Sequence, residues 1–208
     1  MGISVDANPP VAITLRAIEA TPATFEEYGQ VIEASSGAEE FGPHDAQLDV
    51  ARGIPRFYIM HLEGRSRQFF AITHHASVTQ CLGSIGGHVW YLGVAKSSML
   101  DSNEIEGDEH GKNVVRSHCG HFYVPPAVSD VCAFRISGPK FLKLNRGTWH
   151  AGPLFTADAM DFYNLELSNT NILTVARAIT FYLCRYCFQY NKVAHSPPNM
   201  NRPFRFSC

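Results

Sequence analysis

The chain has 208 residues, 45 % of them hydrophobic and 17 % charged, which is typical of one medium-sized globular domain. A formal net charge of −2 argues against a nucleic-acid partner, because such binders usually carry a basic stripe. The opening residues lack the basic start and continuous apolar run of a signal peptide, so we expect a cytoplasmic protein without a membrane span. In that setting the six cysteines are expected to be free thiols.

The first predicted element is a short helix within residues 24–33. Thr24 and Glu27 have the spacing of a capping box, in which each side chain satisfies the other residue's free amide. Gly29 predicts that the helix ends early.

Most of the chain after this helix is predicted to be strand, in short segments rich in β-branched and aromatic residues and separated by turn residues. These segments are residues 54–61, 68–73, 88–95, 121–126, 130–136, 141–145 and 161–167. In the last of them Tyr163, Leu165 and Leu167 alternate with Asn164 and Glu166, the period of a half-buried strand. Two polar stretches, about 34–53 and 97–120, are predicted to be surface loops. The pattern indicates an all-β, mainly antiparallel sandwich or barrel with one or two short helices.

The composition changes abruptly near residues 169–171. Residues 167–208 contain five basic residues and no acidic one, together with three of the six cysteines. We therefore predict a folded domain over residues 1–171 and a basic, cysteine- and aromatic-rich tail over 172–208 that need not be ordered.

Two stretches far apart in the sequence predict a common site. In HHASVTQCLGSIGG, a turn at Ala76 and Ser77 would place His75 and Gln80 side by side, a useful pair for orienting a carboxylate or urea-like group. The spacing of His75, Gln80 and Gly87 matches the first cupin motif, with Gln80 where that motif usually has Glu. Residues 147–150 (GTWH) match the end of the second cupin motif. Together they favour a cupin-like β-barrel or jelly roll.

A metal in this site would take His75, Gln80 and His150 as its ligands. This set brings no charge to offset a divalent cation, and Thr73 stands where cupins usually have another histidine. We therefore expect no tight structural metal, and at most an open, weakly held divalent ion completed by substrate oxygens and water.

The sequence resembles the ureidoglycolate lyase family, also called ureidoglycolate hydrolase, over about residues 11–171. The resemblance runs through ATPATFEEYGQVIE and HHASVTQCLGSIGG and is most specific in NRGTWHAGPLF and MDFYNLELSNTN, which are especially like the plant members. It implies a cupin β-barrel, commonly a homodimer, that cleaves ureidoglycolate to glyoxylate and urea, and nickel is the metal sometimes named for the family. After Asn171 the chain departs from the family's short acidic ending.

This substrate suggests a role for each candidate. Eliminating urea needs a base for the hydroxyl proton, an acid for the departing nitrogen, and a cation for the carboxylate. His150 is expected as base or acid, with His75 and Gln80 orienting the hydroxyl or ureido group. Arg146 is the candidate for the carboxylate, and Lys143 competes with it. Further candidates are Thr79 beside Gln80, Trp149 as a wall of the site, and Asp161, which equally fits a turn cap.

Three other functions are compatible with the sequence. The chain could be a hydrolase that releases ammonia from ureidoglycolate, another metal-dependent cupin enzyme, or a non-catalytic protein that binds a small acid. Fold alone does not decide among them.

Overall fold

The computed structural model describes residues 13–37, 40–101, 113–170 and 174–183, the last range for its backbone only. It contains the helix α1 (Pro22–Phe25) and the 3-10 helix η1 (Val128–Asp130). The strands are β1 (Ile13–Leu15), β2 (Ala17–Glu19), β3 (Gly29–Ile32), β4 (Pro55–Glu63), β5 (Gln68–His75), β6 (Gln80–Ser84), β7 (Trp90–Ala95), β8 (Met99–Leu100), β9 (Val115–Arg116), β10 (Phe122–Tyr123), β11 (Cys132–Ile136), β12 (Phe141–Leu144), β13 (Trp149–Leu154), β14 (Ala159–Leu167) and β15 (Thr174–Leu183).

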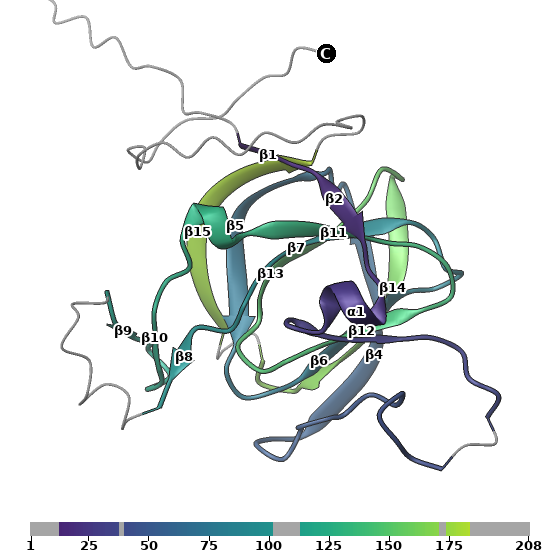
Figure 1. Ribbon diagram of the computed structural model, residues 1–208, viewed down its shortest axis with the longest axis horizontal. Coiled ribbons are helices and arrows are strands. Elements are labelled where there is room, and N and C mark those ends of the chain that lie inside the picture. Colours follow the sequence, from purple (N-terminus) through teal and green to yellow (C-terminus); the bar gives the residue numbers. More distant parts are fainter. Residues whose placement is uncertain (1–12, 38–39, 102–112, 171–173, 184–208) are drawn as a thin grey trace, which may run out of the picture.

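The strands form two large sheets and one small sheet (Figure 1). The seven-stranded sheet, called the large sheet below, has the order β1-β15-β5-β13-β7-β11-β2. The five-stranded sheet has the order β3-β12-β6-β14-β4, and the small sheet has the order β8-β10-β9. Neighbouring strands are antiparallel except for the pairs β1–β15 and β2–β11. The fold is therefore all-β, mainly antiparallel and jelly-roll-like, as predicted, with a single short α-helix in the described residues. The described strands hydrogen-bond as open sheets rather than as one closed barrel.

The main hydrophobic core lies between the two large sheets. The five-stranded sheet contributes Leu82, Leu142, Leu144 and Phe162, and the large sheet contributes Trp90, Leu92, Val94, Phe134 and Ile136. On each strand these residues are two apart, as expected when one face of a pleated strand is buried. A side chain that shares their phase therefore points into the interior.

A second core covers the opposite face of the large sheet. It includes Phe69, Ala133, Trp149 and Leu154 from that sheet and Tyr123 from the small sheet. The large sheet is consequently buried on both faces, which explains why its strands are apolar almost throughout.

The predicted helix over residues 24–33 is wrong in its position and length. The helix is a single turn over Pro22–Phe25, and the capping box joins Thr21 and Thr24 rather than Thr24 and Glu27. Proline is favoured in the first helical turn because its missing N–H would be unpaired there in any case. Residues 29–32 instead form β3, whose backbone pairs with β12 and whose Val31 enters the core.

All seven predicted strand segments are strands, with ends shifted by up to three residues. The described part of 34–53 is loop, whereas 97–120 contributes the two-residue strands β8 and β9. Residues 174–183 of the predicted tail form β15, which pairs with β5 and β1 in the large sheet. Residues 184–208 lie outside the described part of the chain. Within the described residues, the structure contains no helix with the length and apolar character needed to cross a bilayer.

Candidate functional site

Two connections at one end of the sandwich bring together the two sequence stretches that were predicted to form the site. Strand β5 ends at His75 in the large sheet, and after residues 76–79 the chain enters the five-stranded sheet at Gln80. Strand β12 ends at Leu144 in the five-stranded sheet, and after residues 145–148 the chain returns to the large sheet as β13. Leu144 is the cross-strand partner of Gln80, and the amide of Gly147 donates to the carbonyl of His75 at 2.9 Å. Both turns therefore lie side by side.

His75 and His150 meet inside this end of the sandwich. Their ring centroids are 5.0 Å apart, with an angle of 60° between the ring planes. His150 is directly opposite Val94, a core residue, and directly opposite Thr73, which lies two residues before His75. The two imidazoles therefore share the inward face of the large sheet, although they are 75 positions apart in the sequence.

The environment of His150 decides which ring nitrogen can act as a base. Its Nδ1 is 3.2 Å from the carbonyl oxygen of Thr148, and because a carbonyl only accepts, Nδ1 carries the proton. Nε2 is then the acceptor of the ring. Burial lowers the pKa of His150, while the hydrogen bond to Thr148 acts in the opposite direction. Burial and the neighbouring His150 and His74 lower the pKa of His75. Both rings are therefore neutral at pH 7.

A buried hydrogen-bonded network faces them from the five-stranded sheet. Gln80 Nε2 donates to Asn164 Oδ1 at 3.0 Å, and Asn164 Nδ2 donates to Glu166 Oε2 at 3.0 Å and to the Tyr58 hydroxyl at 2.9 Å. The Tyr58 hydroxyl donates to Glu166 Oε1 at 3.2 Å, and Arg56 lies 3.4 Å from the same oxygen. Within the network, Gln80 Oε1 is buried without a hydrogen-bond partner. A buried unpaired acceptor is costly and points to a ligand that would supply a donor.

Sequence reasoning missed four residues of this network: Arg56, Tyr58, Asn164 and Glu166. The alternation predicted in DFYNLEL is confirmed, but Asn164 and Glu166 have exposures of only 1 % and 3 %, whereas Tyr163 is 46 % exposed. The polar residues of this strand face inward because they share the phase of Phe162, a core residue. The signal in the sequence was a carboxylate and an amide two residues apart on a strand.

Arg146 lies at the same end of the sandwich. Its Nε donates to the carbonyl of Ala76 at 2.9 Å, and its guanidinium is 3.6 Å from Asp49. Because the guanidinium has five donors, these contacts leave it able to bind a further carboxylate. Thr79 is nearby but serves the fold, since its hydroxyl accepts from the amide of Asp49 at 2.8 Å and thereby holds the 40–53 loop.

Three predicted substrate-binding residues lie on other faces. Lys143 alternates with the core residues Leu142 and Leu144 and so lies on the outer face of the five-stranded sheet, where it donates to Asn145 at 2.7 Å. Asp161 is also on that outer face and is half-exposed, and its Oδ1 lies 2.7 Å from Nδ1 of His61. Trp149 lies in the second core and donates to the Ser98 hydroxyl at 2.9 Å. The structure does not bring these three to the interior site.

His74 belongs to a separate buried cluster behind the large sheet. Its ring contacts Trp149 at a centroid distance of 4.1 Å, and its Nε2 is 2.8 Å from Nε2 of His121. Burial is the largest cause of a pKa lowered to about 3 for His74, with the nearby His121 and His150 acting in the same direction. Its Nδ1 is buried without a hydrogen-bond partner. This cluster is a structural element of the second core.

The donor set in the interior does not fit a resident nickel ion. His75, His150 and Gln80 are all neutral, and the facing carboxylate of Glu166 is already bonded to Asn164, Tyr58 and Arg56. Divalent nickel bound by imidazoles usually needs further ligands or charge compensation. Among the described residues, no three histidine, cysteine, aspartate or glutamate side chains are arranged to hold a metal.

Comparison with known proteins assigns no family to this chain. No protein-family model matches the chain, and no curated protein matches it by sequence. The fold and the interior site define a jelly-roll-like β protein with two neutral imidazoles facing a buried amide–carboxylate network.

Proposed function

We propose that the chain is a ureidoglycolate lyase that releases glyoxylate and urea. The proposal rests on the sequence resemblance and on one observation of the site, the meeting of His75 and His150 opposite Gln80 and its network. Ureidoglycolate carries a carboxylate, a hydroxyl and a ureido nitrogen on one carbon. Its cleavage requires proton transfer and positioning but no nucleophile.

His150 has the tautomer that this elimination needs. Nε2 takes the hydroxyl proton, and the electron pair of the O–H bond forms the carbonyl of glyoxylate. The C–N bond breaks with its electron pair going to nitrogen, which takes the same proton from the imidazolium and leaves as urea. The carbonyl of Thr148 supports the imidazolium through Nδ1–H, so a histidine that is neutral at rest can carry the proton briefly.

The other residues position the substrate. Gln80 Oε1, buried and unpaired, is suited to accept an N–H of the ureido group. His75, beside His150, contacts the hydroxyl or the ureido group. Arg146 at the rim of the site binds the carboxylate with paired hydrogen bonds. Asn164 and Glu166 hold Gln80 in place through the network.

Product analysis tests this function directly. The full chain is incubated with ureidoglycolate, with and without added Ni²⁺ or Mn²⁺, and glyoxylate, urea and ammonia are measured separately. Equal amounts of glyoxylate and urea without added metal are expected. Ammonia without urea would indicate a hydrolase, strict dependence on metal would indicate another cupin chemistry, and saturable glyoxylate binding without turnover would indicate a non-catalytic small-acid-binding protein.

A further inference from the structure

The network beside the interior site contains two side-chain amides, those of Gln80 and Asn164. An amide presents a donor from its nitrogen and an acceptor from its oxygen, and the two ends have almost the same shape. Which end of Gln80 points at the site therefore depends on the hydrogen-bond partner of the amide rather than on its size. That partner is Asn164, whose Oδ1 lies 3.0 Å from Gln80 Nε2.

Glu166 determines the orientation of both amides. A carboxylate only accepts hydrogen bonds, so the group that lies 3.0 Å from Glu166 Oε2 has to be the amide nitrogen of Asn164. The same nitrogen donates to the Tyr58 hydroxyl at 2.9 Å. The oxygen of Asn164 must consequently face Gln80, and a reversed Gln80 would place two acceptors against each other. Gln80 Oε1 is thereby left for the interior site, where it is buried without a partner among the described residues.

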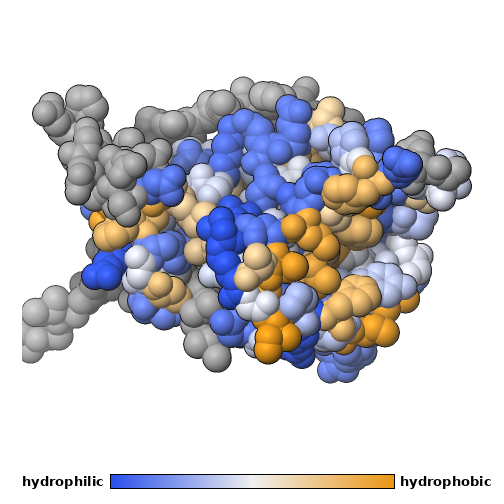
Figure 2. All heavy atoms as spheres, turned by 90° about the horizontal axis from the view of Figure 1, so that it is seen from below, coloured by the Kyte–Doolittle hydropathy of each residue, from blue (hydrophilic) through white to orange (hydrophobic). Residues whose placement is uncertain are grey.

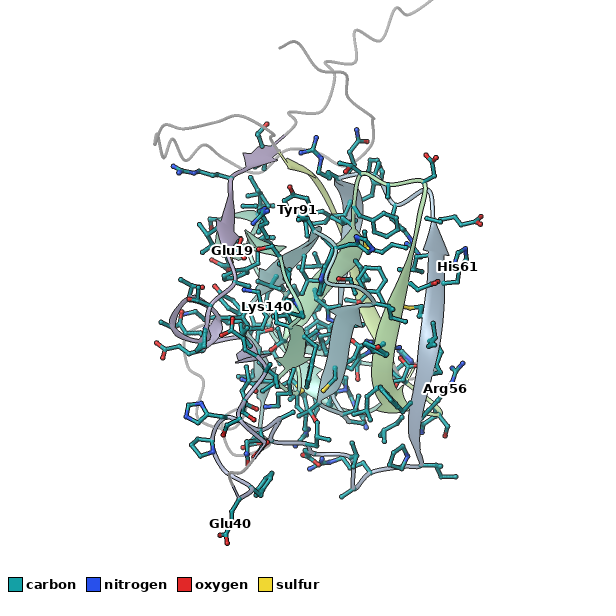
Figure 3. The ribbon with its side chains drawn as sticks, turned by 90° about the vertical axis from the view of Figure 1, so that its right-hand side faces the viewer. Glu19, Glu40, Arg56, His61, Tyr91 and Lys140 are labelled. Carbon is teal, nitrogen blue, oxygen red and sulfur yellow. The ribbon has the colours of Figure 1, made fainter. Side chains whose placement is uncertain are left out.

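Arg56 and Tyr58 hold the carboxylate at the outer end of this network. The Tyr58 hydroxyl donates to Glu166 Oε1 at 3.2 Å, and the Arg56 guanidinium, stacked 3.7 Å from the centroid of the Tyr58 ring, lies 3.4 Å from the same oxygen. Figure 2 views the molecule from the end at which Arg56 lies, where hydrophilic side chains lie beside hydrophobic ones. Figure 3 shows Arg56 toward this end of β4 and His61 farther along the strand. The network thus runs from a half-exposed guanidinium to the buried oxygen of Gln80.

We infer that Glu166 is a positioning residue that sets the polarity of the interior site. Acting through Asn164, it makes Gln80 present an acceptor. The site therefore selects a ligand with an N–H donor at this position, as in a urea or an amide, over a ligand of the same shape with an ester oxygen there. A buried acceptor that meets another acceptor loses its hydrogen bond, so affinity differs by about 10-fold or more between the two. The inference deepens the proposed function and rests on it for the place of the substrate.

Glu166→Gln is expected to reverse the network. Arg56 and Tyr58 are donors, so they favour the oxygen of the new amide at the Oε1 position, which places its nitrogen where Oε2 was. Asn164 must then turn its oxygen toward residue 166 and its nitrogen toward Gln80. Gln80 turns in response and presents Nε2, a donor, to the site. The substitution keeps the volume of the side chain, so the polarity of the site changes with little change in packing.

Isothermal titration calorimetry of the full chain with two unreactive analogues of ureidoglycolate tests this polarity. N-carbamoylglycine lacks the hydroxyl and keeps the ureido N–H donors, whereas monomethyl succinate has the same charge and an ester in place of the ureido group. The wild type is expected to bind N-carbamoylglycine about 10-fold or more tightly than monomethyl succinate. In Glu166→Gln this preference is expected to disappear or to invert. Asp161→Asn, which removes the same charge from the outer face of β14, is the matched control and is expected to keep the wild-type preference.

The inference is overturned if Glu166→Gln keeps the wild-type preference, or if the wild type binds both analogues equally or binds neither. The measurement follows binding and not turnover, so its failure can be told apart from a failure of the proposed function. A protein that shows the expected change of preference but releases no glyoxylate and urea would refute the lyase activity and leave the role of Glu166 intact.

Nuclear magnetic resonance of the wild type tests the orientation of the amides and does not depend on the folding of a variant. With Asn164 Nδ2 turned toward Glu166 and the Tyr58 hydroxyl, the amide protons of Asn164 lie close to the Tyr58 ring. A nuclear Overhauser effect between these amide protons and the ring protons of Tyr58 is therefore expected in the free protein. Its absence would mean that the oxygen of Asn164 faces the carboxylate, and it would overturn the inference.

Discussion

Replacing Asn164 with leucine tests whether the polar side of β14 really faces the interior. Asn164 is 1 % exposed and bonds Gln80, Tyr58 and Glu166. Leucine has a similar size but no polar atoms, so Gln80 Nε2 and one carboxylate oxygen of Glu166 lose their partners while remaining buried. Each buried group left unpaired costs about 1–3 kcal/mol, and more when it is charged.

We therefore expect Asn164→Leu to lower the free energy of unfolding by about 3–5 kcal/mol, which for a domain of this size lowers the Tm by roughly 10 °C. Guanidinium unfolding followed by circular dichroism measures the change. Asp161→Asn on the outer face of the same strand is the matched control, and its cost is expected to stay within about 1 kcal/mol because exposed ion pairs contribute little. A cost below about 1 kcal/mol for Asn164→Leu would refute the inward phase of β14.

Three further predictions concern the titration of His74, the turn at residues 145–148 and the binding of the substrate. Because burial holds the pKa of His74 near 3, the unfolded chain binds one more proton there between pH 6.5 and 3; stability falls by up to about 1.4 kcal/mol per pH unit as the pH drops through that window. In urea unfolding at pH 7, 6 and 5, His74→Gln is expected to flatten this decline, and an unchanged slope would contradict it. Gly147 has φ +76°, and an added Cβ would lie 2.3 Å from Ser97 Oγ. Gly147→Ala is therefore expected to lower the free energy of unfolding, measured by thermal unfolding, by about 2–3 kcal/mol. A loss of less than about 0.5 kcal/mol would show that the turn accepts a side chain without strain. Under the proposed function, Arg146→Gln is expected to raise the KM for ureidoglycolate by roughly 10- to 100-fold with a smaller change in kcat; an unaltered KM in steady-state assays would remove Arg146 from the site.

The sequence allowed the fold class to be predicted, together with the two stretches that meet at the site. Short β-branched and aromatic segments separated by turns predicted the strands, and the spacing of His75, Gln80 and His150 predicted residues that the structure brings to one end of the sandwich. The alternation of side chains along a strand and the residues that form turns both depend on neighbours in the sequence. Both signals can therefore be recognised without knowing which strands pair with each other.

The faces of the strands could not be predicted in the same way. Alternation shows which residues share a face but not which face is buried, and both faces of β14 carry apolar residues. The local sequence does not show that Glu166 is buried, because its partners Tyr58 and Arg56 lie more than one hundred positions earlier in the chain. The helix was misplaced for a local reason, since Thr21 and Thr24 offered a second capping box beside Pro22.

Turnover of ureidoglycolate by a His150→Ala variant tests the central claim most directly. Trp149→Phe is the control, because Trp149 is adjacent in sequence but lies on the opposite face of the strand. If His150 carries the proton, kcat falls by about 100-fold or more in His150→Ala, while circular dichroism and the KM stay close to the wild type. A folded His150→Ala enzyme that releases glyoxylate and urea at nearly the wild-type rate would contradict the account.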